Sequence, residues 1–374
     1  MITMYRPTVA QIDLAAIRDN LHAIRACLPP GTEVIGIVKA DAYGHGAVRV
    51  SEVLEQEHIR LLAVATPDEA VELRDAGLAT EILVLGHASP DFVPYAIRNN
   101  ITLTTDGHAT AALYAAAVDA GRLRVHYKVD TGMGRAGVLA DTAAEQIKSS
   151  AALPTIDIVG LYSHLASAES DPDLTAWQAE RFSGIVREVR ASGLRPSMVH
   201  LANSAGIFTV HGEPLDGVRP GILLYGLAPT PSLAGSCPVR PSLSLLTRLE
   251  VVKDLPQGHG IGYGRTFVTE RPTRMGLIPI GYADGYPRSL SNRASVIVRG
   301  HLAPVVGRVS MDVAAIDVTD VPAAAPGDLV TLIGTQDGLS ITAADLASLA
   351  GTISYEIITG ISKRVPRIYT DHQL

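Results

Sequence analysis

The sequence is poor in several features, and each shortage excludes a class of protein. It holds only two cysteines, Cys27 and Cys237, neither in a CxxC pair, so neither a disulfide framework nor a zinc site is expected. The net charge is −7 and no lysine/arginine block occurs, which argues against a nucleic-acid partner. No apolar run is long enough to span a membrane, and the first residues do not resemble a signal peptide. We therefore expect a protein of the reducing cytoplasm, with no metal site.

The composition is that of a globular protein with a large core. Of the 374 residues, 47% are hydrophobic and 18% are charged. This length exceeds one ordinary domain, but it accommodates a barrel of about 250 residues and a smaller unit. We find no internal repeat and no low-complexity tract.

A regular alternation of strand-like and helix-like segments fills the first two thirds of the chain. Helix-like segments such as 67–76, 108–120 and 174–191 separate apolar runs of strand type. The runs are 34–39, 61–66, 81–86, 101–105, 124–130, 157–165, 197–203 and 217–224. Eight strands alternating with helices predict an α/β fold, an N-terminal (β/α)8 TIM-type barrel.

The pattern changes at 230–243, a stretch rich in proline, glycine and serine that indicates a linker. Beyond it the chain is predicted to be mostly β, with one helix at 342–350 capped by Thr342. The expected strands are 244–254, 273–281, 294–299, 304–309, 312–318 and 328–333. We expect domains 1–234 and 235–374, with the first strand, about 5–13, a candidate to pair with the second domain.

Polar side chains stand where the barrel strands are predicted to end, the face on which such barrels bind ligands. They are Lys39, Lys128 with Asp130, His164, Asn203 with Ser204, and Arg219. A lysine at the end of a buried strand has a lowered pKa and becomes a nucleophile, although it could also extend to water. His164 taken alone could be a hydrogen-bonded core histidine. Several such groups on one face favour a site, because burying unpaired charge is costly.

Two stretches near the last strands suggest a phosphate site. Ser204 opens a predicted short helix at 204–210, and Gly221 allows close approach of the backbone on the eighth strand. Phosphates recur at this place in barrels, and the sequence contains no nucleotide P-loop. A nucleophilic lysine beside a phosphate site suggests pyridoxal phosphate.

The stretch VKADAYGHGA around Lys39 resembles the cofactor-lysine signature of bacterial alanine racemases. Further matching stretches follow in the family's order and cover nearly the whole chain. They are KVDTGMGRAGV, GLYSHLASAES, HLANSAG, GVRPGILLYG, GIGYGRTF, GYADGYPR and GRVSMD. The resemblance implies a homodimeric enzyme, with active sites shared between subunits, that interconverts L- and D-alanine and supplies D-alanine for peptidoglycan.

The resemblance also implies roles for single residues. Lys39 would hold the cofactor and act as the base for D-alanine. Tyr263 would act for L-alanine from the partner subunit, a role that needs a basic neighbourhood because the usual tyrosine pKa is about 10. The implied phosphate-binding residues are Tyr43, Ser204, Gly221, Ile222 and Tyr355.

The remaining implied roles concern the cofactor ring, the substrate and the entrance. Arg219 would face the ring nitrogen and be oriented by His164. Arg135 would contact the cofactor's phenolic oxygen and, with the N–H of Met311, the substrate carboxylate. Lys128 matches a lysine that is often carbamylated. The implied entry-channel residues are Asp171, Tyr282, Arg288 and Arg308, with Tyr355.

Three alternatives remain open from the sequence. A racemase of broader specificity fits the same residues. An amino-acid decarboxylase of this architecture would pair the ring nitrogen with a carboxylate, which Arg219 disfavours. A non-catalytic carrier of pyridoxal phosphate would be a barrel alone, without the second domain and its Tyr263.

Overall fold

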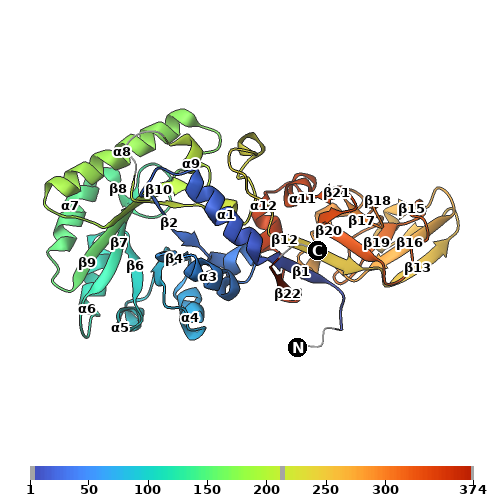
Figure 1. Ribbon diagram of the computed structural model, residues 1–374, viewed down its shortest axis with the longest axis horizontal. Coiled ribbons are helices and arrows are strands. Elements are labelled where there is room, and N and C mark those ends of the chain that lie inside the picture. Colours follow the sequence, from blue (N-terminus) through green and yellow to red (C-terminus); the bar gives the residue numbers. More distant parts are fainter. Residues whose placement is uncertain (1–4, 211–214, 372–374) are drawn as a thin grey trace. The chain divides into compact units, whose positions relative to one another are not determined.

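The computed structural model describes residues 5–210 and 215–371, drawn in Figure 1. The chain divides into two compact units. The barrel unit is Ala16–Ala42 with Gly46–Arg240; the β unit combines the described residues up to 15, Tyr43–His45 and the chain from Pro241 onward. Within the described ranges, no helix has both the length and the apolar character needed to cross a membrane.

The barrel unit is built on one parallel sheet whose two ends are consecutive in the chain. Its strand order is β2-β11-β10-β9-β7-β6-β5-β4-β3. Only Ile35 separates β2 from β3, and its N–H donates to the Val218 carbonyl at 2.9 Å. The two short strands therefore form one strand position, and the predicted eight-stranded barrel is confirmed. The strands are β2 (Glu33–Val34), β3 (Gly36–Ile37), β4 (Leu61–Val64), β5 (Glu81–Val84), β6 (Ile101–Thr105), β7 (Leu123–Asp130), β9 (Ile156–Tyr162), β10 (Met198–Asn203) and β11 (Gly217–Arg219).

Helices cover the outer side of these strands, as Figure 1 shows for α3 to α8. The longest begins where the Asp171 carboxylate accepts the Leu174 N–H at 2.9 Å. It buries Phe182, Val186 and Val189, which share one helical face, against the strands. The helices are α1 (Leu14–Ala26), α3 (Ala47–Gln56), α4 (Pro67–Asp75), α5 (Val93–Arg98), α6 (His108–Ala116), α7 (Ala140–Ala151) and α8 (Pro172–Ala191). Helical segments thus separate the strands as the sequence pattern predicts.

Several predicted strand ends in the barrel are wrong. The strands predicted at 61–66, 81–86 and 157–165 end at Val64, Val84 and Tyr162, so His164 lies just beyond its strand. β3 ends at Ile37, and Lys39 is the first residue of the short helix α2 (Lys39–Gly44) rather than the last of a strand. The eighth strand stops at Arg219 because Pro220 has no N–H to continue the ladder, and α10 (Gly221–Leu224) follows. The short helix expected at 204–210 is α9 (Gly206–Thr209).

The β unit contains the first strand of the chain. β1 (Val9–Asp13) pairs antiparallel with β12 (Leu243–Arg248) and parallel with β22 (Arg367–Thr370). This places β1 inside the sheet β18-β17-β20-β12-β1-β22. The other elements are β13 (Val251–Leu255), β14 (Gly260–Ile261), β15 (Phe267–Val268), β16 (Thr273–Ile278), β17 (Ser295–Val298), β18 (His301–Pro304), β19 (Ala314–Asp317), β20 (Leu329–Gln336), β21 (Leu339–Ile341), α11 (Ala343–Ala350) and α12 (Ser354–Thr359). The unit is mostly β, as predicted.

Backbone hydrogen bonds explain where the β-unit predictions hold and fail. The predicted strand 244–254 is two strands, because the N–H of Leu249 donates to one sheet and that of Glu250 to another. The predicted strand 304–309 is wrong, since β18 ends at Pro304 and Gly307 adopts a positive φ of 77°. The Thr342 cap is confirmed: its side chain accepts the Asp345 N–H at 3.1 Å in a capping box.

Candidate active site

A strained turn follows directly after Lys39. Four successive non-glycine residues, Ala40 to Tyr43, have positive φ between 51° and 54°. Such left-handed residues cost about 1–2 kcal/mol each, so other contacts must hold them. The Ala40 N–H donates to the Glu69 carboxylate at 2.7 Å, and the Asp41 carboxylate accepts the Ala47 N–H at 2.8 Å. Strain of this kind is concentrated at functional sites.

The barrel unit gathers three basic side chains, Lys128, Arg135 and Arg219, around Lys39. Burial lowers the Lys39 pKa, and the charges of Arg135 and Arg219 lower it further. Burial, followed by the same two arginines, lowers the Lys128 pKa to about 8. Mutual repulsion among these groups means that an anion bound between them would be stabilised.

The carboxylates that oppose this positive charge are already engaged by backbone donors. Glu69 accepts the N–H groups of Ala40, Ala65 and Thr66. Asp130 accepts those of residues 132–135; burial acts to raise the Asp130 pKa, but these bonds give it a net decrease. The bond from the Arg135 N–H to the Asp130 carboxylate, 3.1 Å long, also holds the backbone of Arg135 in place. The basic cluster therefore suits an external phosphate or carboxylate group.

Arg219 is 5% exposed and donates to several acceptors. One terminal nitrogen, Nη1, lies 2.5 Å from His200 Nδ1. The other, Nη2, donates to the carbonyl oxygens of Ser163 (2.7 Å) and Leu201 (2.8 Å) and lies 3.2 Å from His164 Nδ1. These contacts compensate for burial of the charge and fix the plane of the guanidinium.

Two buried histidines, His200 and His126, continue the hydrogen bonds of Arg219, and the sequence analysis missed both. Burial and the charge of Arg219 lower the His200 pKa well below its usual value, so the ring is neutral. Guanidinium only donates, so His200 Nδ1 must accept and its proton must be on Nε2. That nitrogen lies 2.9 Å from His126 Nδ1 and donates to it. His126 is neutral too, because burial first and nearby arginines second lower its pKa to about 3.

The Tyr162 ring packs against His200 and lies near Arg219 and Lys128. Its ring stacks on His200 with centroids 4.9 Å apart, and the guanidinium carbon of Arg219 lies 5.5 Å from its centroid. The Lys128 amine lies 5.6 Å from the same centroid. Burial raises the Tyr162 pKa to about 12, so the phenol stays neutral and offers the two cations its π face.

Gly160 leaves the space that the His126 ring occupies, since a Cβ there would overlap that ring. Gly160→Ala is expected to lower the free energy of unfolding by about 1–3 kcal/mol through overpacking. Urea denaturation measures this change. Gly184→Ala is the matched control in helix α8, where an added Cβ would meet only Arg187 Nη2 at 4.0 Å, and it should be neutral or stabilising. Equal stability of the Gly160→Ala variant and the parent would contradict the tight packing.

The predicted phosphate-binding residues occur in both units. In the barrel unit, buried Ser204 accepts the Leu223 N–H at 3.3 Å, which joins it to the first turn of α10, where Gly221 and Ile222 lie. In the β unit, the rings of Tyr43 and Tyr355 lie 6.0 Å apart. Within each unit, the structure therefore brings together residues that are far apart in sequence.

Tyr263 projects from a glycine-rich turn of the β unit. It begins the 3-10 turn η3 (Tyr263–Arg265), with positive φ at Gly262 and Gly264 on either side. Its side chain is 71% exposed. A Cβ on Gly264 would lie 3.5 Å from the guanidinium carbon of Arg308, which places this positive charge beside the turn.

Tyr282 and Met311 lie on adjoining loops of the β unit. The N–H of Ala283, the residue after Tyr282, donates to the Met311 carbonyl at 3.0 Å. Both Tyr282 and Met311 are exposed, and Arg288 begins the nearby 3-10 turn η5 (Arg288–Leu290). Apolar side chains exposed in this way are typical of surfaces that contact another molecule.

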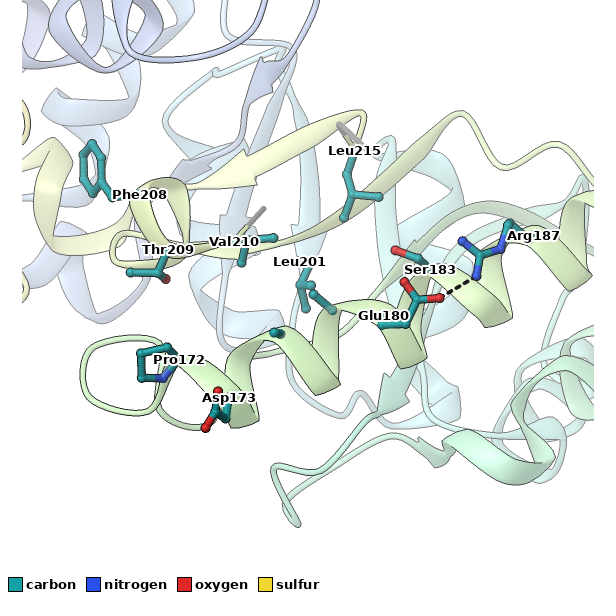
Figure 2. Close-up of a pocket in the computed structure, with 12 residues that line it drawn as sticks. Pro172, Asp173, Glu180, Ser183, Arg187, Leu201, Phe208, Thr209, Val210 and Leu215 are labelled. Atoms are coloured by element: carbon teal, nitrogen blue, oxygen red, sulfur yellow. Dashed lines mark hydrogen bonds and ion pairs between the residues drawn. The ribbon is translucent and has the colours of Figure 1, made fainter. Parts of the chain in front are cut away.

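A separate cavity of about 780 Å³ lies beside α8 in the barrel unit, shown in Figure 2. An ion pair between Glu180 and Arg187 (2.7 Å) lies along it. The described lining residues are Pro172, Asp173, Ala176, Ala179, Glu180, Ser183, Arg187, Leu201, Phe208, Thr209, Val210 and Leu215. None of these is a predicted site residue. Asp171, predicted for the entry channel, directly precedes Pro172 and is the N-cap of α8.

Comparison with known families identifies the chain. The family model described as "Alanine racemase, N-terminal domain" matches residues 12–229. The model described as "Alanine racemase, C-terminal domain" matches residues 242–369. The chain belongs to the alanine racemase family. It is therefore an enzyme of the isomerase class.

Individual alanine racemases agree over nearly the full length. The chain is 42% identical to one from Desulfovibrio desulfuricans, covering 99% of this chain and 100% of that one. It is 43% identical to one from Halothermothrix orenii, covering 97% of each. The crystal structure of the Bacillus anthracis alanine racemase with bound L-Ala-P has a TM-score of 0.92 at 36% identity, covering 98% and 96%. That of the Streptomyces lavendulae enzyme has 0.93 at 34%, covering 99% of each.

Within this alanine racemase fold, the predicted site residues form groups inside each unit. The barrel group is Lys39, Lys128, Arg135, His164, Ser204, Arg219, Gly221 and Ile222; the β-unit group is Tyr43, Tyr263, Tyr282, Arg288, Arg308, Met311 and Tyr355. The sequence analysis missed His126, Tyr162 and His200. Period-2 spacing could have found His126, because it precedes Lys128 by two on the same face of β7. Tyr162 ends β9 and His200 lies inside β10, and no local spacing marks either of them.

Proposed function

We propose that the protein interconverts L-alanine and D-alanine with pyridoxal phosphate, and that Lys39 and Tyr263 move the proton on opposite faces of Cα. The observation that carries the proposal is Lys39 itself: it is half-buried, its pKa is lowered, and two arginines lie near it. A lysine in this state is a nucleophile toward an aldehyde and a base for a carbon acid. The names of the relatives support the substrate.

The residues present fit pyridoxal phosphate by their donor chemistry. The basic cluster offers donors for an anion, while Glu69 and Asp130 are engaged by backbone N–H groups. When bound, the cofactor supplies an electron-withdrawing ring that acidifies the Cα–H of the amino acid. Lys39 would hold it covalently and Arg219 would face its ring nitrogen. Its phosphate would be bound by Tyr43, Ser204, Gly221, Ile222 and Tyr355.

The protein's own groups would then position alanine and move one proton. Arg135 and the Met311 N–H would hold the carboxylate, which fixes Cα between the two bases. The Lys39 amine would take the proton from D-alanine, or return it on that face. The Tyr263 oxygen would do the same for L-alanine on the other face. Two bases are needed because one cannot easily reach both faces.

We propose that Tyr263 acts across a homodimer, in the active site of the partner subunit. The exposed apolar side chains of the β unit support an interface there: Tyr263 is 71%, Met311 52% and Tyr282 42% exposed. Asp171, Tyr282, Arg288 and Arg308, with Tyr355, would form the entry channel. A narrow chamber closed by tyrosines would favour a methyl side chain.

Lys128 is proposed to carry a carbamate formed with carbon dioxide. Carbamylation needs a neutral amine, and the pKa of about 8 leaves an appreciable neutral fraction near neutral pH. The modified group would be an anion beside Arg135 and would hold that guanidinium in place. Burial of the lysine supports retention of the modification.

Arg219 is proposed to suppress side reactions. Guanidinium cannot give up its proton, so the ring nitrogen facing it would remain an unprotonated acceptor and the ring a weaker electron sink. Arg219→Glu is therefore expected to slow racemisation and raise transamination products, measured as pyruvate formed per alanine racemised. A variant that racemises as fast and as cleanly as the parent would refute this role.

The function is tested by incubating the purified chain and pyridoxal phosphate with L-alanine and resolving the enantiomers. Growth of D-alanine to an equal mixture supports the proposal. Release of carbon dioxide from lysine, ornithine or diaminopimelate would establish the decarboxylase instead. Cofactor binding without turnover would indicate a carrier, and equal rates with serine or lysine a broader racemase.

We propose that the protein acts in the cytoplasm, where it supplies D-alanine for peptidoglycan. This role rests on the family and on the substrate proposed above. Rescue of a bacterial strain that requires external D-alanine tests it, with Lys39→Ala as the inactive control. Failure of the active protein to rescue growth would count against this role.

A further inference from the structure

Cys27 and Cys237 lie side by side in the barrel unit, although 210 positions separate them in sequence. Their sulfur atoms are 3.4 Å apart. Cys27 directly follows helix α1, and Cys237 lies in the linker after the 3-10 turn η2 (Pro231–Leu233). The sequence contains no other cysteine. The sequence analysis expected no disulfide framework because no CxxC pair is present, but the fold supplies the proximity that spacing does not.

Contacts independent of sulfur hold this part of the linker against α1. Asn20 is 1% exposed, and its amide nitrogen donates to the carbonyl oxygens of Leu224 (3.1 Å) and Arg240 (2.9 Å). Its amide oxygen accepts the Arg240 N–H at 2.8 Å. Asn20 lies seven residues, about two helical turns, before Cys27, so the two share one face of the helix end. The hydrogen bonds of Asn20 therefore hold the linker residues near Cys237 against the end of α1, where Cys27 lies.

We propose that Cys27 and Cys237 form a reversible disulfide when the protein meets a low-molecular-weight disulfide. The Cys27 thiolate attacks one sulfur of the oxidant, forms a mixed disulfide and releases one thiol. Cys237 loses its proton and attacks the Cys27 sulfur, which forms the internal bond and releases the second thiol. The protein loses two hydrogens and two electrons, and the small disulfide gains them as two thiols.

The surroundings of the two sulfurs set this order. Cys27 is exposed, while Cys237 is 5% exposed. Burial, and then the contact with Cys27, raise the Cys237 pKa to about 12, so Cys237 is a poor first nucleophile. Cys27 can meet an oxidant in solution, and Cys237 needs only to reach a sulfur already beside it.

The bond would close a loop that contains the whole barrel between α1 and the linker. A link between such distant residues restricts the unfolded chain more than the folded one, whose geometry already nearly allows it. The oxidised protein is therefore expected to melt at a higher temperature, by about 5 °C or more. Exposure to a reducing agent should reverse the change.

The experiment uses the full chain, reduced, freed of reductant and treated with oxidised glutathione. We expect an intact mass lower by two hydrogens, loss of both titratable thiols in denaturant, and a peptide pair joining Cys27 to Cys237. Dithiothreitol should restore the mass and the thiols. A chain that keeps both thiols, that retains glutathione on Cys27, or that links through Cys27 to a second chain would overturn the proposal.

Two single variants separate the steps. Cys237→Ser should retain glutathione on Cys27, because the second thiol that displaces it is missing. Cys27→Ser should react several-fold more slowly, because its remaining thiol is buried. Neither variant should gain thermal stability on oxidation. Equal stabilisation of the parent and Cys237→Ser would show that the bond is not the cause.

Discussion

Replacing Lys39 by alanine is expected to lower racemisation in both directions by at least about 10⁴-fold, since one side chain is proposed both to hold the cofactor and to move a proton. The side chain is half-buried and its pKa is lowered, chiefly by burial. The absorbance of the lysine-bound cofactor should disappear, and borohydride should no longer trap the cofactor on the chain. Chiral chromatography and the absorbance spectrum measure the two effects.

A surface lysine provides the matched control. Lys148 on α7 pairs with Glu188 at 2.8 Å and is exposed, whereas Lys39 is half-buried. Lys148→Ala should keep the spectrum, the trapping and the racemisation rate. If Lys39→Ala still trapped the cofactor covalently, another amine would be the anchor and the proposed site would be wrong.

Replacing Tyr263 by phenylalanine is expected to separate the two enantiomers. Exchange of the Cα proton of L-alanine with solvent should fall by about 10²–10⁴-fold, the usual contribution of a general base. Exchange in D-alanine should persist, because Lys39 can remove and return the proton on its own face. Racemisation should fall with the slower step. Proton NMR in deuterated water follows both exchanges.

The exposure of Tyr263 makes this a clean substitution. Its side chain is 71% exposed, so loss of the hydroxyl should leave folding unchanged. Tyr5→Phe, at a tyrosine that is 94% exposed, is the control and should change neither exchange rate. Equal losses for both enantiomers in Tyr263→Phe would refute a base specific to one face.

The barrel could be predicted because its signal is repeated along the chain. Each strand is buried on both sides and reads as a short apolar run, while helices such as α4 begin with sequence-encoded caps. Thr66 and Glu69 form such a capping box at α4. Signals of this kind are local, so one sequence suffices to find them.

The turn after Lys39 could not be predicted because no local signal encodes it. Alanine at positions 40 and 42 gives no reason to expect a positive φ. The conformation is imposed by hydrogen bonds from outside the turn, including that to Glu69. The contact between His200 and His126 could not be predicted either. His164 could be found because it stands at a predicted strand end. His200 lies inside β10, and only the closed barrel brings it to His126.

The position of β1 has a consequence for synthesis on the ribosome. β1 is made before the barrel, yet its neighbours β12 and β22 are made after it. At ordinary elongation rates it waits on the order of ten seconds or more for β12. The barrel helices can pack meanwhile, but the nascent chain carries an unpaired strand edge throughout, and this sheet is complete only once β22 has emerged. Severing the chain at the linker would leave either fragment without part of that sheet.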